Sequence, residues 1–267
     1  MGEIFNFIFV HPLINVLVGI YQLLEIVHIP NALGFSIILL TVIIRLILWP
    51  FTASQLQTTR KMQEVSPELS KLKEKYKGDA KRIQQETMLL YKKHGVNPFG
   101  GCLPTIIQLL LFPALYSVFQ TFVGSDKSTI IQNFNKVLYF DFLKLQSLQD
   151  PTFFGLPLGQ SPAQLISHIP LILLIPVVTA LLQFVQSKMM FSATPPQKTK
   201  DGKEPDFQTV FQKQIIYIIP FTIGFAAYNF PVGLSLYWNT FTVFAMIQQY
   251  KLNGLGGIEP WISKLKK

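Results

Sequence analysis

Charged side chains are missing from four long stretches of the chain, with a single exception. Apart from Arg45, no Asp, Glu, Lys or Arg occurs in residues 26–59, 94–125, 151–187 and 214–250. A helix needs about 20 predominantly apolar residues to cross the hydrocarbon core of a bilayer. Every one of these stretches is longer than that, so the pattern predicts an all-α membrane protein.

The uncharged stretches predict five transmembrane helices, over residues 33–56, 98–123, 163–188, 214–229 and 232–250. The last two share one uncharged run of 37 residues. As a single helix this run would be ~55 Å long, whereas the hydrocarbon core is only ~30 Å thick. The segment Asn229-Phe230-Pro231-Val232-Gly233 offers a break, because proline lacks a backbone donor and glycine permits a turn.

The basic residues predict the orientation of these helices. Of the 267 residues 49% are hydrophobic and 14% charged, and the net charge is +9. Lys and Arg gather in 57–97, 189–213 and the tail 251–267, whereas 124–162 carries balanced charges. Since Lys and Arg accumulate in cytoplasmic loops, we expect those three segments and the C-terminus inside, and the loop 124–162 and the N-terminus outside. Basic runs can also bind nucleic acid, but their regular alternation with apolar spans favours topology, so no direct nucleic-acid recognition is expected.

For residues 1–32 the sequence predicts an amphipathic helix rather than one of the five transmembrane helices. His11, Asn15, Gln22 and Glu25 fall within about 80° on a helical wheel. Such a stripe is typical of an amphipathic helix that lies in the membrane interface. The alternative is a sixth span, which would place the N-terminus inside. No basic segment precedes the apolar one, so a cleaved signal peptide is not expected.

Segment 57–97 predicts a cytoplasmic helical hairpin. Ser66-Pro67-Glu68 combines an N-cap residue, a proline and an acid in the order of a helix start. Asp79 offers a cap for a second helix, which we expect to run to about Lys93. The hairpin suits a docking surface for a partner or for lipid headgroups, and the alternative is a solvated connection between two spans.

Arg45 is the charge that a membrane span should not contain. An arginine at the centre of a span costs ~2.5–3.5 kcal/mol on insertion scales. All 14 acidic residues lie outside the five predicted spans, so water, neutral polar groups or a passing substrate must solvate the guanidinium. Polar residues on the other spans predict a hydrated cavity around it, although polar residues also join helices, and an arginine can snorkel to the interface. The polar candidates are Thr41, Gln108, Gln183, Gln186 and Asn239.

Signs of catalysis or of a bound cofactor are not found in the sequence. The four histidines are scattered without metal-ligand spacing, and Cys102 is the single cysteine, so no internal disulfide is possible. An ion-coupled transporter usually has a titratable acid inside the membrane, and the predicted spans contain none. We therefore expect neither an enzyme nor a cofactor, and no metal.

Several short motifs in series resemble a known family, the YidC membrane protein insertases. The resemblance covers about 33–123 and 163–252 in order. It is carried by Gly34–Thr52, Lys61–Glu64, Pro67–Leu69, Lys75-Tyr76, His94–Pro98, Gly100–Pro104, Phe230–Leu234, Leu236–Trp238 and Ile247–Gln249.

The resemblance implies a function and its site. Proteins of this family insert small membrane proteins and assist the folding of others, through a hydrophilic groove that is open to the cytoplasm and to lipid. It implies that Arg45 is the groove arginine, that Trp238 beside Tyr237 is the groove aromatic, and that Gln183 or Gln186 faces the groove. The implied partners are nascent membrane proteins, the lipid bilayer, the ribosome, the signal recognition particle pathway and the Sec translocon, in a bacterial plasma membrane. Two alternatives are a transporter or channel with a wet intramembrane cavity, and a chaperone that binds clients without translocating their tails.

Overall fold

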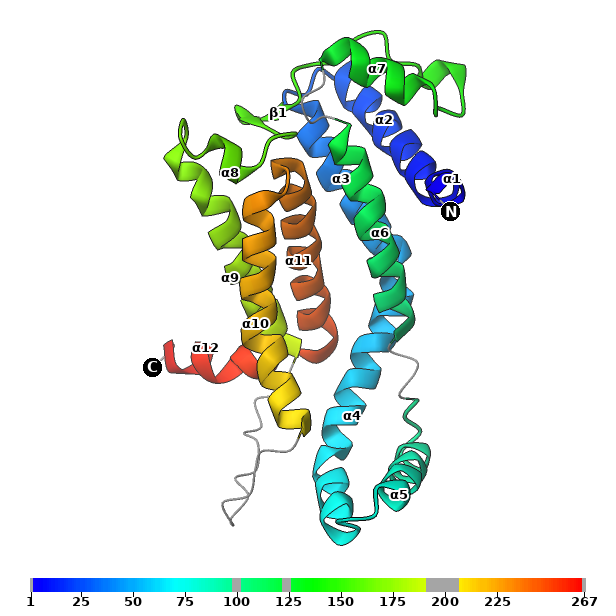
Figure 1. The fold of residues 1–267 in the computed structure, drawn as a ribbon, viewed down its shortest axis with the longest axis vertical. Coiled ribbons are helices and arrows are strands. Elements are labelled where there is room, and N and C mark those ends of the chain that lie inside the picture. Colours follow the sequence, from blue (N-terminus) through cyan, green and yellow to red (C-terminus); the bar gives the residue numbers. More distant parts are fainter. Residues whose placement is uncertain (1, 98–101, 122–125, 191–206, 266–267) are drawn as a thin grey trace.

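The computed structural model describes residues 2–97, 102–121, 126–190 and 207–265. Helices dominate this part of the chain, and a hairpin of two short strands accompanies them (Figure 1). The α-helices are α1 (Gly2–Phe5), α2 (His11–Ile26), α3 (Ala32–Ile47), α4 (Trp49–Lys75), α5 (Ala80–Lys93), α6 (Cys102–Gln120), α7 (Lys127–Asn135), α8 (Pro162–Leu165), α9 (Leu174–Met190), α10 (Phe207–Asn229), α11 (Val232–Asn253) and α12 (Glu259–Leu265). A π-helix, η1 (Asn6–Val10), joins α1 to α2, and the 3-10 helices are η2 (Asp141–Leu143), η3 (Pro170–Leu173) and η4 (Gly256–Ile258). Strand β1 (Thr152–Phe153) pairs antiparallel with β2 (Leu156–Pro157).

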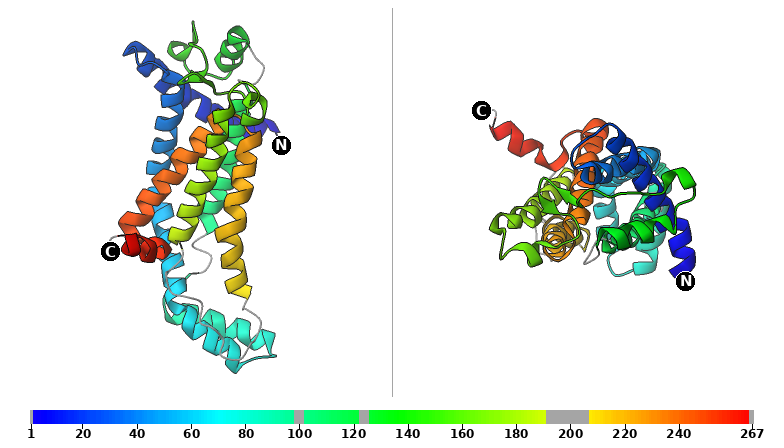
Figure 2. Two further views of the ribbon diagram at one scale, coloured as in Figure 1. Left: turned by 90° about the vertical axis from the view of Figure 1, so that its left-hand side faces the viewer. Right: turned by 90° about the horizontal axis from the view of Figure 1, so that it is seen from above.

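Helices α3, α6, α9, α10 and α11 form an elongated bundle (Figures 1 and 2). Helix α11 lies between α3 and α9, and α10 packs along α9. At Gly224 of α10 the backbone comes so close to α9 that a Cβ atom would lie 2.8 Å from the Cβ of Ala180. Large apolar side chains point away from the bundle, among them Leu181, Phe221 and Phe225, which are 58–76% exposed. Such an outer surface suits lipid, so the apolar helices and their packing confirm an α-helical membrane protein.

The number of spans stays a prediction. By length and composition, two helical segments of the described chain can cross a membrane, Gly2–Ile26 and Pro170–Met190. A third is the bent pair of α3 and α4, and two shorter apolar helices cover Gln108–Gln120 and Ile216–Asn229. The first segment is the one that the sequence assigned to the interface, so both interpretations of residues 1–32 remain open.

The expected first span, 33–56, is not one continuous helix. Helix α3 ends at Ile47, α4 begins at Trp49, and the two axes meet at 63°. Pro50 lies in the first turn of α4, where its lack of an N–H group is tolerated, whereas it would break the hydrogen-bond ladder of an uninterrupted helix. The chain therefore changes direction here and leaves the bundle as α4.

The helix start predicted at Ser66-Pro67 is wrong, because α4 continues through Pro67 to Lys75. Val65 and Leu69 on α4 are each 4% exposed and form a small core with Tyr91 of α5 and with Val96. This packing holds the helix together across the proline. The second half of the hairpin is confirmed: the Asp79 carboxylate accepts a hydrogen bond from the Arg82 N–H, and α5 ends at Lys93.

Residues 126–165, here called the outer cap, cover one end of the molecule and bind the polar stripe of α2. The Asn15 amide donates to the Val137 carbonyl over 2.9 Å and accepts from the Tyr139 N–H over 2.7 Å. The Gln22 amide donates to the Leu143 carbonyl over 2.8 Å. Asn15 is only 7% exposed, so these polar groups face the chain's own loop. The stripe does not by itself indicate contact with headgroups, which corrects the reason for placing this helix in the interface.

The outer cap also closes over the first turn of α11. The Val232 and Gly233 N–H groups donate to the carbonyls of Gln160 and Leu158, both over 2.9 Å. These bonds satisfy two donors that a helix start leaves free. The predicted break between the last two helices is confirmed, since α10 ends at Asn229 and α11 begins at Val232.

The opposite end of the molecule, here called the basic end, carries the α4–α5 hairpin, Lys188 and Lys251. The predicted basic tail 251–267 is not simply an extension, because α11 runs to Asn253 and is followed by η4 and α12. Of the predicted loop 189–213, residues 191–206 lie outside the described residues.

Candidate functional site

Arg45 lies in the seam between α3 and α11, on the last turn of α3 before the bend. Its side chain is 4% exposed. Nε and one terminal nitrogen donate to the Phe241 carbonyl over 3.2 and 2.8 Å. The guanidinium carbon also lies 3.4 Å from the centroid of the Phe241 ring, an arrangement that attracts a cation. In the part of the chain that the structure describes, no acidic side chain pairs with Arg45, so a backbone dipole and an aromatic face hold its charge.

Below Arg45 the same seam crosses the bend between α3 and α4. The Trp49 and Phe244 rings pack edge to face, with centroids 5.8 Å apart. The Gln248 amide donates to the Trp49 carbonyl over 3.2 Å and to the Thr52 hydroxyl over 2.7 Å. Helix α11 thus binds the chain on both sides of the 63° bend.

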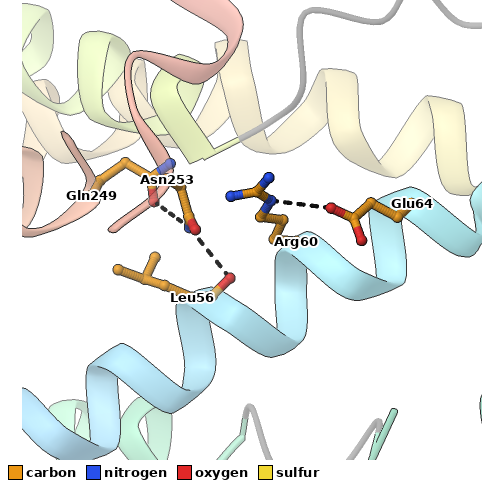
Figure 3. A network of polar contacts seen from close by, with 5 residues as sticks. All are labelled: Leu56, Arg60, Glu64, Gln249 and Asn253. Carbon is orange, nitrogen blue, oxygen red and sulfur yellow. Dashed lines mark hydrogen bonds and ion pairs between the residues drawn. The ribbon is translucent and has the colours of Figure 1, made fainter. Parts of the chain in front are cut away.

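The seam ends in a polar network at the basic end (Figure 3). The Asn253 amide donates to the Leu56 carbonyl over 3.4 Å and to Gln249 Oε1 over 3.3 Å. Gln249 in turn donates to the Met189 carbonyl at the end of α9 over 3.0 Å. An exposed ion pair between Arg60 and Glu64, 3.1 Å long, lies one turn further along α4 (Figure 3). Helices α4, α9 and α11 are therefore joined by side chains at this end.

A second group of predicted site residues meets on the other side of α11. The Gln108 amide on α6 donates to the Tyr237 hydroxyl over 3.2 Å. The Trp238 indole N–H donates to Gln183 on α9 over 3.2 Å, and the Gln183 amide reaches Gln186 over 3.1 Å. Tyr237 and Trp238 thus face different helices, although they are neighbours in sequence.

A cavity of about 380 Å³ opens beside this group, between α6, α9, α10 and α11. Its wall is almost entirely apolar, and Gln108, Thr179, Ser235 and Trp238 contribute to it mainly with their apolar atoms. In the described residues, the Ser235 hydroxyl and the amide oxygen of Asn239 are buried without a hydrogen-bond partner. Buried polar atoms in native proteins are normally hydrogen-bonded, so these two are exceptions inside the bundle.

The structure places the predicted site residues in two groups. Gln108 and Trp238 line the cavity, and Tyr237 and Gln183 bond to them. Arg45 is not among the described residues of the cavity wall. It adjoins the cavity group through Tyr237, whose ring packs on Phe241 at 5.8 Å. The Thr41 hydroxyl bonds within its own helix, to the Ile37 carbonyl over 2.6 Å, and the Gln186 amide bonds to the Met190 sulfur.

Sequence reasoning missed the groups that hold the arginine and shape the cavity. The acceptor for Arg45 is a main-chain carbonyl, which no side-chain pattern can reveal. Phe112 packs edge to face on Trp238 with centroids 5.6 Å apart and also contacts Phe230. Phe112 lies among other apolar residues in the uncharged run 94–125, so the sequence does not distinguish it from its neighbours. No group of three or more His, Cys, Asp or Glu in the described residues could hold a metal ion.

Buried polar groups between apolar helices, with lipid-facing side chains outside, define an integral membrane protein. Residues 25–256 match the model of the family described as 60Kd inner membrane protein, and the chain belongs to this family. The resemblance to the YidC insertases that its motifs carry is thereby confirmed.

Named relatives agree with this assignment. The membrane protein insertase YidC of Oceanobacillus iheyensis is 31% identical over 258 residues, which cover 94% of this chain and 84% of that protein. The chloroplast inner membrane protein ALBINO3 of Arabidopsis thaliana is 34% identical over 250 residues, 89% of this chain and 50% of that protein. The chain thus spans about half the length of this chloroplast relative. A crystal structure of an active YidC insertase is similar at a TM-score of 0.48 and 24% identity, over 89% of this chain and 44% of that one.

Proposed function

We propose that the chain is a membrane protein insertase and chaperone. It captures the polar tail of a nascent membrane protein inside the bundle and releases the apolar segment of that client into lipid. The observation that carries the proposal is Arg45, a buried guanidinium held by one backbone carbonyl and one aromatic ring rather than by an acid. A carboxylate on a passing client is a better partner for arginine than either, because it carries the opposite charge and can accept two parallel N–H bonds from the guanidinium.

The proposed path for the client is a groove that combines the cavity with the α3–α11 seam. Gln108, Ser235 and Trp238 lie on the largely apolar cavity wall, with Gln108 and Trp238 bonded to Tyr237 and Gln183. Tyr237 connects this wall to Phe241, to which Arg45 is bonded. The buried Ser235 hydroxyl and Asn239 amide oxygen have no hydrogen-bond partner in the described residues, and in this proposal water or the polar tail of the client supplies one.

The energies are of a suitable size for a short acidic tail. A charge crossing the bilayer gains ~2.3 kcal/mol per 100 mV of membrane potential. This is close to the ~2.5–3.5 kcal/mol that insertion scales assign to a charge at the bilayer centre. Burial of the client's apolar segment in lipid supplies the remaining driving force, so neither a nucleotide nor another cofactor is required.

In this proposal the protein lies in a bacterial plasma membrane with the basic end in the cytoplasm and the outer cap outside. The N-terminus is then outside and the C-terminus inside. The α4–α5 hairpin is exposed at the cytoplasmic side, where it can meet a ribosome, the signal recognition particle pathway or the Sec translocon. No role in nucleic-acid recognition or catalysis is proposed for any residue.

The test is insertion by the purified protein in liposomes. The client is a single-span protein with a short acidic tail, and the readout is protection of that tail from added protease. We expect protection with the natural protein, a large loss in Arg45→Ala, and little change in Arg60→Ala, which removes an exposed arginine from the same chain. If the tail is protected equally in both variants, Arg45 has no part in capture; if it is never protected, the chain is not an autonomous insertase.

A channel or transporter with a wet intramembrane cavity is the alternative. It would release a trapped ion or small solute from the same liposomes without any client. An insertase closed at the outer cap retains the solute, so one flux measurement separates the two functions.

A further inference from the structure

The chain turns sharply after α11 and is locked in the turned direction. Gly254 and Gly256 adopt φ angles of +76° and +54°, which L-residues with a side chain rarely adopt. At Gly256 the backbone presses against the end of α9, where a Cβ atom would lie 2.0 Å from the Met189 carbonyl oxygen. Ile258 is buried directly after this contact. The direction of α12 is therefore fixed by packing and does not depend on a free tail.

In this fixed direction α12 runs across the long axis of the bundle. Two perpendicular views show it projecting sideways beyond α9 and α10 (Figures 1 and 2). Trp261 on α12 returns to α9, where its ring stacks on Phe184 at 6.0 Å between centroids. The Lys188 ammonium lies 4.1 Å from the centre of the same ring.

The sequence marks the depth at which α12 lies. Lys188 ends the uncharged stretch 151–187, and Lys251 ends the uncharged stretch 214–250. Two neighbouring helices thus pass from apolar to charged at the level of Trp261. A helix that projects sideways from a membrane bundle at that level lies over lipid headgroups.

The exposed side chains at this level match a membrane interface. Tyr217, Tyr250 and Trp261 are 57%, 59% and 45% exposed, and Trp and Tyr are enriched at the boundary between hydrocarbon and water. Lys188, Lys251 and Lys264 add three positive charges, while α12 itself holds one acid, Glu259. Basic residues at this depth attract anionic lipids.

We propose that α12 is an interfacial anchor of the basic end, at which Trp261 inserts between lipids while Lys188, Lys251 and Lys264 bind the headgroups of anionic phospholipids. The contacts of Trp261 with Phe184 and Lys188 join the anchor to α9, so the anchor sets the height of α9 in the bilayer. This inference goes beyond insertion, and it requires only that the protein lies in a membrane.

The depth of α12 is tested with a spin label on the full-length protein. Ser263→Cys carries the label in a Cys102→Ser background, and Ser70→Cys on the exposed face of α4 is the matched reference. Nanodiscs contain phosphatidylcholine with phosphatidylglycerol, and collisions with oxygen and with a water-soluble nickel chelate report depth. We expect the oxygen-to-nickel ratio at 263 to be several-fold higher than at 70, and Trp261→Ala to lower it. Equal ratios at the two positions would overturn the proposal.

The lipid chemistry is tested by removing charge. We expect the triple variant K188Q/K251Q/K264Q to lose its preference for phosphatidylglycerol over phosphatidylcholine vesicles in a lipid-exchange assay. The control K71Q/K77Q/K81Q removes the same charge from the α4–α5 hairpin and should keep that preference. An equal loss in both triples, or protection of position 263 from the nickel chelate only after ribosomes are added, would show that α12 does not bind lipid.

Discussion

The side chains of Thr52 on α4 and Gln248 on α11 hydrogen-bond directly after the bend between α3 and α4, with 2.7 Å between the Gln248 amide nitrogen and the Thr52 hydroxyl oxygen. Gln248 is 1% exposed and also donates to the Trp49 carbonyl. One buried amide on α11 thus fixes the point at which the chain leaves the bundle for the α4–α5 hairpin.

Loss of this amide should destabilise the protein and loosen the hairpin. In Gln248→Ala the Thr52 hydroxyl and the Trp49 carbonyl both lose a partner, and a lost hydrogen bond of this kind costs about 0.5–1.5 kcal/mol. Thermal unfolding in detergent measures the stability, and hydrogen exchange measures the mobility of α4. Gln186→Ala is the control, since among the described residues the Gln186 amide bonds only within its own helix, to Gln183 and to the Met190 sulfur. Equal effects of the two changes would contradict a special role for the bend.

Asn15 is expected to hold the outer cap on α2. Its replacement by Ala removes two partly buried bonds, to the Val137 carbonyl and from the Tyr139 N–H, each worth about 0.5–1.5 kcal/mol. We expect faster hydrogen exchange and faster proteolysis in residues 137–149. Asn229→Ala should leave this segment unchanged, because the Asn229 amide bonds to the Phe225 carbonyl within α10.

Alanine substitutions at Gly254 and Gly256 distinguish two sources of destabilisation at the turn before α12, backbone strain and steric overlap. Gly254→Ala places a side chain at a φ of +76° with no atom within 4 Å of the new Cβ, so only strain of about 1–2 kcal/mol is expected. Gly256→Ala has similar strain and an overlap with the Met189 carbonyl, at 2.0 Å. We expect Gly256→Ala to lower the melting temperature more than Gly254→Ala. The reverse order would contradict the packing of the turn against α9.

The α4–α5 hairpin should lose stability at high pH. Burial raises the pKa of Tyr91 above its usual value of 10.0, because it disfavours the phenolate. A raised pKa in the folded state means that the stabilisation is complete below pH 10 and is lost as the pH rises through the folded pKa. Hydrogen exchange of α5 between neutral and strongly alkaline pH would show this. Tyr91→Phe keeps the packing without the titrating group, so it should show a smaller alkaline loss than the natural protein.

Filling the cavity should stop insertion without unfolding the chain. Ala226→Phe adds a ring to the wall of the 380 Å³ cavity, whereas Thr222→Phe adds the same ring to the exposed face of α10. We expect tail protection to fall sharply in Ala226→Phe only, with both variants showing similar thermal unfolding. Normal insertion by a folded Ala226→Phe protein would exclude the cavity from the path of the client.

The helices that could be predicted from sequence are those whose ends depend on local chemistry. Pro231 breaks the last uncharged run, and Asp79 caps α5, because each acts on its own neighbours in the chain. Pro50 and Pro67 show the limit of such reasoning. The first stands at a bend and the second inside a continuous helix, and the difference lies in Val65 and Leu69, which pack on α5.

Arg45 could be singled out from sequence, but its surroundings could not. The absence of acids from the spans left water, neutral polar groups or a passing substrate as partners, and the structure supplies a main-chain carbonyl and the ring of Phe241. The polar stripe of α2 had the converse problem. A helical wheel shows that Asn15 and Gln22 share one face of the helix. It does not show whether that face contacts lipid headgroups or, as here, a loop more than a hundred residues further along the chain.

The bonds from Val232 and Gly233 to the outer cap have a consequence for hydration at this end of the molecule. The first turn of α11 finds its acceptors in the protein's own loop, so two backbone donors that a helix start leaves free do not have to be satisfied by water.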